Sequence, residues 1–254
     1  MGRASHSPLK SILMNNPFSI LNTTRKQFGW SAAGRLLLDR LGARLLQRHV
    51  MEVVWLNLKQ AESCQPVPGF EFRFLTAKEV WRFSTDPSLD LDANLAAEVE
   101  RGQSLCFAAL ENDRLAAYGW YAIQRATPSH CFGVGIRLPA HVVYMFKGFT
   151  HSSYRGLRLH AAVMGLALAT LSERGIQALI STVEWTNESS LRSCDRLGFE
   201  RLGRISQTGS FGARRVSIPA TLQRQTGVEF VPEQQWRDTE IRSQFEVERS
   251  ASAR

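Results

Sequence analysis

Apolar residues recur along most of the chain with spacings that predict alternating strands and helices. Residues 70–75 (FEFRFL) alternate apolar and polar side chains, as in a half-buried strand. Residues 104–110 and 114–123 are apolar and flank the turn sequence Glu-Asn-Asp, so they predict a β-hairpin. The further predicted strands are 141–150, 178–185, 199–207 and, as a candidate last strand, 213–219; the predicted helices are 77–101 with a break near Asp86-Pro87, 157–175 and 187–198.

This order of elements predicts a mixed α/β domain, with an α+β mixed sheet, over residues 69–220. Two prolines and a glycine just before residue 70 mark its start. Residues 1–68 then form an N-terminal extension, and residues 221–254 form a polar C-terminal tail. We expect residues 225–254 of this tail to be partly disordered, because they contain few apolar residues that could be buried.

The N-terminal extension contains a basic amphipathic segment at residues 31–50, which predicts a helix, because leucines and arginines each recur there every four residues. Residues 1–30 have weak periodicity and are expected to be loosely structured, whereas 51–58 predict a short strand or a continuation of the helix. Three interpretations of the helix stay open: packing on the domain with its arginines in water, attachment to an anionic membrane surface or an acidic partner, and dimerisation. The two stripes are Leu37, Leu41 and Leu45, and Arg40, Arg44 and Arg48.

The net charge of the chain, +8, is concentrated in this extension. Residues 1–50 hold eight basic residues and one acidic residue, so the rest of the chain is nearly neutral and no nucleic-acid partner is expected. The longest apolar run, residues 161–171, is far shorter than the roughly 20 residues of a membrane span. The four cysteines show no C-x-x-C spacing, and His130-Cys131 has no further ligands at metal spacing. We therefore expect reduced thiols, a cytoplasmic location and no metal.

The segment that carries the clearest chemistry is the junction between strand 141–150 and helix 157–174. The turn between them contains Arg155 and Gly156, and such a turn leaves free backbone N–H groups at the positive end of the helix dipole. That geometry binds phosphate or diphosphate, and Arg158 adds positive charge. A single glycine before a helix is also typical of a plain structural turn, so this motif alone does not establish a phosphate-binding site.

A second motif follows about 30 residues later, where strand 178–185 leads directly into the sequence NESSLRSCDRLGF. The whole unit reads strand, R-G turn, apolar helix, strand, N-x-x-S helix, L-G-F, strand. It resembles the acyl-CoA-binding half of the GNAT superfamily of N-acetyltransferases, whose motifs read [Q/R]-x-x-G-x-[G/A] and N-x-x-A…Y-x-x-x-G-F. The resemblance is specific over residues 142–206 and extends to the order of elements over 70–220.

The resemblance implies that acetyl-CoA, or another acyl-CoA, is the donor. It implies that Phe149 and Thr150 flank the thioester, that Arg155 begins the diphosphate motif, and that Asn187 caps its helix and contacts cofactor or substrate. The backbone N–H groups that would hold the diphosphate belong to Gly156, Leu157, Arg158, Leu159 and His160. The sequence departs from the family at Arg158 and His160, where small residues are usual, and at Cys194, where a tyrosine is frequent.

The implied reaction is direct attack of a neutral amine on the thioester, with backbone N–H groups stabilising the oxyanion. Glu184 and His151 are the candidate bases, and Cys194 is a candidate acid for the departing thiolate. Each has a plainer interpretation: Glu184 as a solvated strand residue, His151 as a hydrogen-bonding loop residue and Cys194 as a core residue.

We therefore expect an N-acetyltransferase that acts on the amine of a small metabolite. The loop pattern resembles bacterial GNAT enzymes, including enzymes that act on amino sugars. The alternative is a non-catalytic acyl-CoA-binding module that docks on a membrane or a partner through residues 31–50. A protein acetyltransferase is a weaker alternative, because the sequence has no acidic cluster near the candidate site. Homodimer formation is left open.

Overall fold

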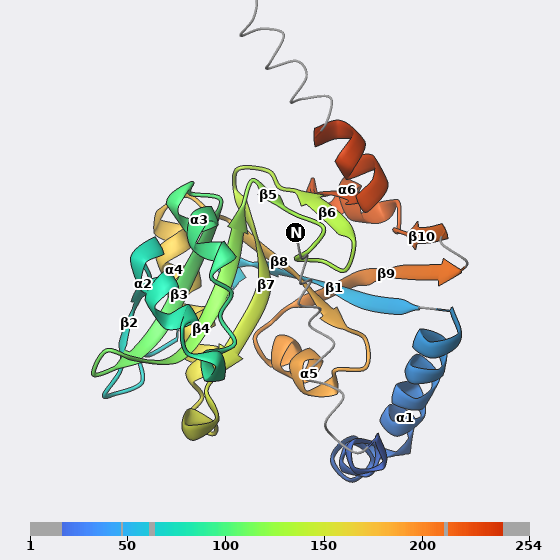
Figure 1. The fold of residues 1–254 in the computed structure, drawn as a ribbon, viewed down its shortest axis with the longest axis horizontal. Helices are drawn as coiled ribbons and strands as arrows, with labels where there is room; N and C mark the ends of the chain where they lie inside the picture. The colour runs from blue at the N-terminus through green and yellow to red at the C-terminus, as the bar shows by residue number, and fades with distance from the viewer. Residues whose placement is uncertain (1–16, 47, 61–63, 211–212, 241–254) are drawn as a thin grey trace, which may run out of the picture.

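The computed structural model describes residues 17–46, 48–60, 64–210 and 213–240. Its main element is an eight-stranded sheet with the order β10-β9-β1-β8-β7-β4-β3-β2, beside a small sheet with the order β11-β6-β5 (Figure 1). β7 and β8 run parallel, and the other neighbouring strands are antiparallel. The strands are β1 His49–Asn57, β2 Glu71–Phe74, β3 Ser104–Glu111, β4 Arg114–Ile123, β5 Arg125–Ala126, β6 Val134–Arg137, β7 Val142–Thr150, β8 Ala178–Glu184, β9 Glu200–Ser210, β10 Ala213–Ser217 and β11 Glu229–Pro232; the helices are α1 Pro17–Leu46, α2 Ala77–Ser84, α3 Asn94–Glu100, α4 Leu159–Glu173, α5 Glu188–Arg196 and α6 Thr221–Thr226.

The two faces of the main sheet are covered by different elements. α4 packs on one face, because it is apolar on several sides, and seven of its residues are buried. On the opposite face, α2 and α3 cover β3 and β4, and the small sheet covers the middle of the main sheet. The expected mixed α/β fold is confirmed, as is the hairpin of β3 and β4. The buried residues of α4 are Leu159, Ala162, Val163, Met164, Ala167, Leu168 and Leu171.

The N-terminal region differs from the sequence-based expectation. The helix begins at Pro17, not near residue 31, and is broken at Gly29, whose φ of 86° is readily accessible only to glycine. The segment 51–58, predicted as either a short strand or a continuation of the helix, lies almost entirely in the strand β1. This strand pairs with β8 on one side and β9 on the other. A boundary at residue 68 would therefore separate β1 from both of its neighbours. Of residues 1–30, all expected to be loosely structured, 17–30 belong to α1, and 1–16 lie outside the described residues.

The C-terminal tail, expected to be partly disordered over residues 225–254, forms regular structure in its described part up to residue 240. β11 pairs with β6, residues 233–240 are helical, and the Trp236 ring lies over Gly135 of β6. The segment 124–140, for which the sequence predicted no strand, contributes β5 and β6 to this small sheet. Residues 241–254 lie outside the described part of the chain. No helix in the described part is both long and apolar enough to cross a membrane.

Candidate functional site

The central feature of the site is the divergence of the parallel strands β7 and β8. They pair only from Val142 to Met145 and from Ala178 to Ser181, and the Ser181 hydroxyl donates a 2.8 Å hydrogen bond to the Met145 carbonyl where the pairing ends. Beyond this point β7 stays paired with β4, and β8 stays paired with β1. The facing edges of the two strands are therefore free to pair with a ligand that enters between them.

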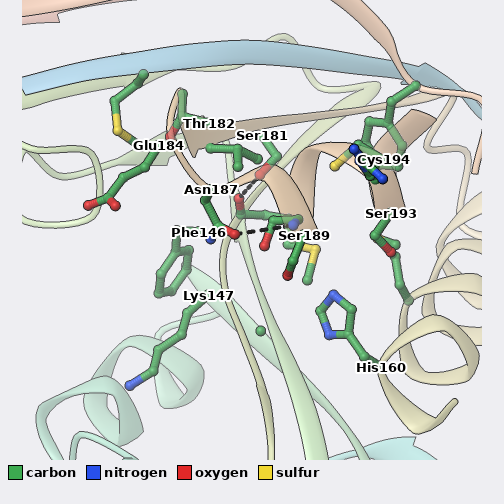
Figure 2. Close-up of a pocket in the computed structure, with 18 of the residues that line it drawn as sticks. Phe146, Lys147, His160, Ser181, Thr182, Glu184, Asn187, Ser189, Ser193 and Cys194 are labelled. Atoms are coloured by element: carbon green, nitrogen blue, oxygen red, sulfur yellow. Dashed lines mark hydrogen bonds between the residues drawn. The ribbon is translucent and has the colours of Figure 1, made fainter. Parts of the chain in front are cut away.

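A cavity of about 770 Å³ opens at this divergence (Figure 2). Strand alternation divides its lining between the two faces of the sheet. Met145 and Val183 lie on the α4 face, while Phe146 and Thr182 lie on the opposite face. The cavity thus connects both faces through the gap. On the α4 face it is lined by His160, Met164, Cys194 and Phe199, and on the opposite face by Met51, Phe132, Phe146, Thr182 and Glu184.

The turn before α4 leaves a row of free backbone donors. In the described part of the chain, the N–H groups of residues 156–161 have no hydrogen-bond partner, and no side chain caps the helix. Gly156 and Arg158 both have positive φ, 88° and 59°. Arg158 therefore adopts the left-handed conformation that glycine would adopt easily, at a cost of about 1–2 kcal/mol. Arg155 and Arg158 are exposed beside these donors.

The predicted cofactor residues are distributed unevenly around the cavity. His160 and Asn187 line it, whereas Phe149 stacks on Tyr118 at 5.2 Å. The Thr150 hydroxyl is buried without a hydrogen-bond partner. Two further candidates, Leu157 and Leu159, have opposite environments, because the first side chain is exposed and the second is buried in the core.

Asn187 confirms the capping prediction for α5. Its side-chain oxygen accepts a 3.2 Å hydrogen bond from the backbone N–H of Ser190. Gly198, with a φ of 81°, follows the end of this helix, in the left-handed conformation that favours glycine there. The cap holds the start of α5 directly beyond the free end of β8, so several α5 side chains reach the cavity.

His160 occupies a position where the GNAT motif usually has a small residue. Its ring packs on the bare backbone of Gly148 in β7, and a Cβ atom at Gly148 would lie 2.4 Å from the His160 Cε1 atom. Burial lowers the pKa of His160 from its usual value, so the ring is neutral at pH 7. The side chain therefore contributes an uncharged wall on the α4 face.

Cys194 lies on the same side of the cavity as His160 (Figure 2). Burial, and then the nearby Asp195 carboxylate, raise the pKa of its thiol to about 11. A thiol of ordinary pKa, about 8.5, is a stronger acid, so transfer of a proton from Cys194 to a leaving thiolate is unfavourable. Its packing against the core cluster under α4 favours the plainer interpretation as a core residue.

Glu184 and His151, the two candidate bases, lie in different places. Glu184 ends β8, pairs across the sheet with Met51 and lines the cavity. Partial burial raises the pKa of Glu184, the Asp39 carboxylate raises it further, and His49 opposes them. His151 is not among the lining residues; its Nδ1 atom accepts a 3.3 Å hydrogen bond from the Ser153 N–H. Geometry therefore brings Glu184 to the cavity and leaves His151 in its loop.

Sequence reasoning missed the cavity residues that come from distant segments. Phe28 of α1, Met51 of β1 and Phe132 of the loop before β6 all line the cavity. No local motif marks them, because only the insertion of β1 and the break in α1 bring them there. Within the described ranges, no three His, Cys, Asp or Glu side chains are grouped so that they could hold a metal ion, at His130 and Cys131 or elsewhere.

The sequence matches the model of the acetyltransferase (GNAT) family over residues 71–199, just over half of the chain. No curated protein matches the sequence. A putative GNAT-family acetyltransferase from Novosphingobium aromaticivorans is 18% identical, with 63% of this chain and 63% of that chain covered and a TM-score of 0.46. A GCN5-related N-acetyltransferase from Kribbella flavida is 14% identical, with 70% and 64% covered and a TM-score of 0.47.

An aminoglycoside acetyltransferase from an uncultured soil metagenomic sample, in complex with sisomicin, is 9% identical, with 51% of this chain and 88% of that chain covered and a TM-score of 0.41. The chain spans less than two thirds of the length of the Novosphingobium and Kribbella structures. The family match contains the diverging strands, the turn before α4 and the capped helix α5. On this match, the chain belongs to the acetyltransferase (GNAT) family.

Proposed function

We propose that this protein is an acyl-CoA-dependent N-acyltransferase that transfers an acetyl group from acetyl-CoA to the amine of a small molecule. The observation that carries the proposal is the gap between β7 and β8, which joins the α4 face, with its free backbone donors, to the face where the Glu184 carboxylate lines the cavity. A donor and an acceptor can therefore meet inside the sheet without either one crossing it.

The donor binds on the α4 face. Its diphosphate accepts hydrogen bonds from the free N–H groups of residues 156–161, where the helix dipole favours negative charge. Arg155 and Arg158 supply further positive charge. The pantetheine amides pair with the free edge of β7, and Asn187 borders the cavity where the thioester carbonyl would lie.

The acceptor amine enters from the opposite face and is bound at Glu184. The Glu184 carboxylate takes one proton from the ammonium, and the neutral nitrogen attacks the thioester carbon. A C–N bond forms, backbone N–H groups of β7 stabilise the oxyanion, and the C–S bond then breaks. The second nitrogen proton goes to solvent, and the thiolate leaves and takes a proton from water.

Thiol release from acetyl-CoA across a panel of primary amines tests this proposal. We expect amine-dependent release that forms one acetylated amine per thiol, measured by a thiol reagent and by mass spectrometry. Calorimetric titration with CoA tests the donor half separately. Tight CoA binding without release under any condition would instead support the alternative, a non-catalytic acyl-CoA-binding module.

We also propose that α1 contacts an anionic membrane surface. Trp30, Leu37 and Leu41 recur at helical spacing after the break at Gly29, and they are exposed together with Leu38, Trp30 at 75% and Leu38 at 65%, whereas Ala32 on the opposite side is buried. α1 also carries five basic residues and one acidic residue. An exposed apolar stripe on a basic helix is suited to the boundary between anionic headgroups and acyl chains.

Vesicle sedimentation tests this contact. We expect the protein to bind vesicles that contain phosphatidylserine more tightly than vesicles of phosphatidylcholine alone, and salt to weaken the binding. Leu38→Ser with Leu41→Ser should weaken it about tenfold or more, because two apolar side chains are lost from the contact. Trp81→Ser, at an exposed aromatic residue of α2, is the control. A stable dimer that the leucine changes disperse would contradict the membrane contact.

A further inference from the structure

The acceptor half of the cavity has a composition that selects among amines. We infer that the acceptor is a primary amine carried on a flat apolar body, of the arylalkylamine class, and not an amino sugar or a lysine side chain. This inference rests on the proposed function. It follows from three features of the face opposite α4: a rigid aromatic floor, an exposed aromatic edge and a shortage of free polar groups.

Phe146 forms the floor. A β-bulge where β7 pairs with β4 turns Phe146 and Lys147 to the same face of the sheet, next to the gap. The Phe146 ring stacks on His130, with centroids 4.1 Å apart and an interplanar angle of 11°, and more loosely on Trp120 and Tyr144. Neighbours on several sides fix the ring, so it presents a preformed flat surface to the cavity.

Phe132 and Met51 form the edge. Phe132 is 42% exposed and has a φ of 43°, a left-handed conformation that bulky residues rarely adopt. Its ring stacks on His49 at 5.8 Å. Met51 lies directly across the sheet from Glu184, so the carboxylate is bordered by apolar surface. An amine whose ammonium group binds Glu184 would therefore place its carbon skeleton against Met51, Phe132 and Phe146.

The polar side chains of this face are largely engaged by other protein groups. The Thr182 hydroxyl lies 2.7 Å from the Tyr144 hydroxyl, and the Lys147 ammonium lies 2.9 Å from an Asp90 carboxylate oxygen. The Glu184 carboxylate makes no hydrogen bond or ion pair within the described residues. A sugar bound at Glu184 would place several hydroxyl groups against Met51, Phe132 and Phe146, which offer them no partner, and each unpaired group would lose binding energy. Apolar contacts and one charge suit an arylalkylamine better.

Competition among three acceptors tests the inference: 2-phenylethylamine, glucosamine and a lysine-containing peptide. We expect kcat/KM for 2-phenylethylamine to exceed the other two values about 100-fold or more. Phe132→Ala should lower kcat/KM for 2-phenylethylamine about tenfold or more, while the value for propylamine changes much less, because propylamine does not reach the edge. Trp81→Ala is the control, since Trp81 is exposed on α2 and does not line the cavity.

Binding of 2-phenylethylamine to the CoA-saturated protein, measured by calorimetry, gives a readout that does not depend on turnover. Binding that Phe132→Ala weakens and Trp81→Ala leaves unchanged would support the acceptor class even if no acetyl transfer were seen. Preference for glucosamine or the peptide, or equal losses for 2-phenylethylamine and propylamine in Phe132→Ala, would overturn it. Failure to bind CoA would instead count against the proposed function.

Discussion

Glu184→Gln is expected to lower kcat/KM at pH 7 by about 10²- to 10⁴-fold, the usual contribution of a positioned base. The substitution keeps the shape of the side chain at the end of β8 but removes its ability to take a proton from the bound ammonium. CoA binding should change little, because the diphosphate donors lie on the other face of the sheet at residues 156–161. The measurement is thiol release with a primary amine at saturating acetyl-CoA.

The pH profile gives a sharper test than the rate alone. In the wild type, kcat/KM should fall as the pH drops through the pKa of Glu184, which burial and Asp39 raise above 4.5. Above that pKa the carboxylate is ionised, so the profile is flat up to the pKa of the amine, about 10. In Glu184→Gln only the neutral amine reacts, so log kcat/KM should rise with a slope of one across the neutral range.

Glu173→Gln is the matched control, because Glu173 is an exposed glutamate at the end of α4 and does not line the cavity. It should leave both the rate and the profile unchanged. A Glu184→Gln variant with wild-type rate and a flat profile would exclude Glu184 as the base. If log kcat/KM rises with pH in both the wild type and Glu184→Gln, the amine always binds in its neutral form.

The parts of the fold that sequence predicted well are those fixed by local chemistry. The hairpin of β3 and β4, the long apolar helix α4 and the cap at Asn187 each depend on residues close together in the chain. β1 could not be assigned in the same way. Its residues 50–54 are all buried, which fits a strand between two others, but nothing local indicates that β8 and β9 are its neighbours.

The same distinction holds for the site. Arg155, Gly156 and Asn187 belong to short motifs, so their elements could be located from sequence. Phe28, Met51 and Phe132 reach the cavity only through long-range packing, and they supply much of its apolar lining. The raised pKa values of Glu184 and Cys194 also depend on burial, which the sequence did not specify. Local motifs thus located the donor side, and the acceptor side required the folded chain.

Trp236→Ala should lower the free energy of unfolding by about 3–5 kcal/mol, the usual cost of removing a large buried aromatic side chain. Trp236 is 6% exposed, its ring lies over Gly135, and Arg137 lies 5.4 Å from the ring centroid. The tail therefore closes the small sheet over the core beneath it. Urea unfolding followed by far-UV circular dichroism measures the change.

Trp81→Ala is the control for size and residue type, because Trp81 is 61% exposed on α2. Its free energy of unfolding should change by less than about 0.5 kcal/mol, as for most surface substitutions. If both tryptophan variants unfold at the same urea concentration as the wild type, residues 229–240 do not contribute to the stability of the domain. A loss confined to Trp236→Ala would instead make this segment part of the domain, so that truncation before residue 229 should destabilise the acetyltransferase fold.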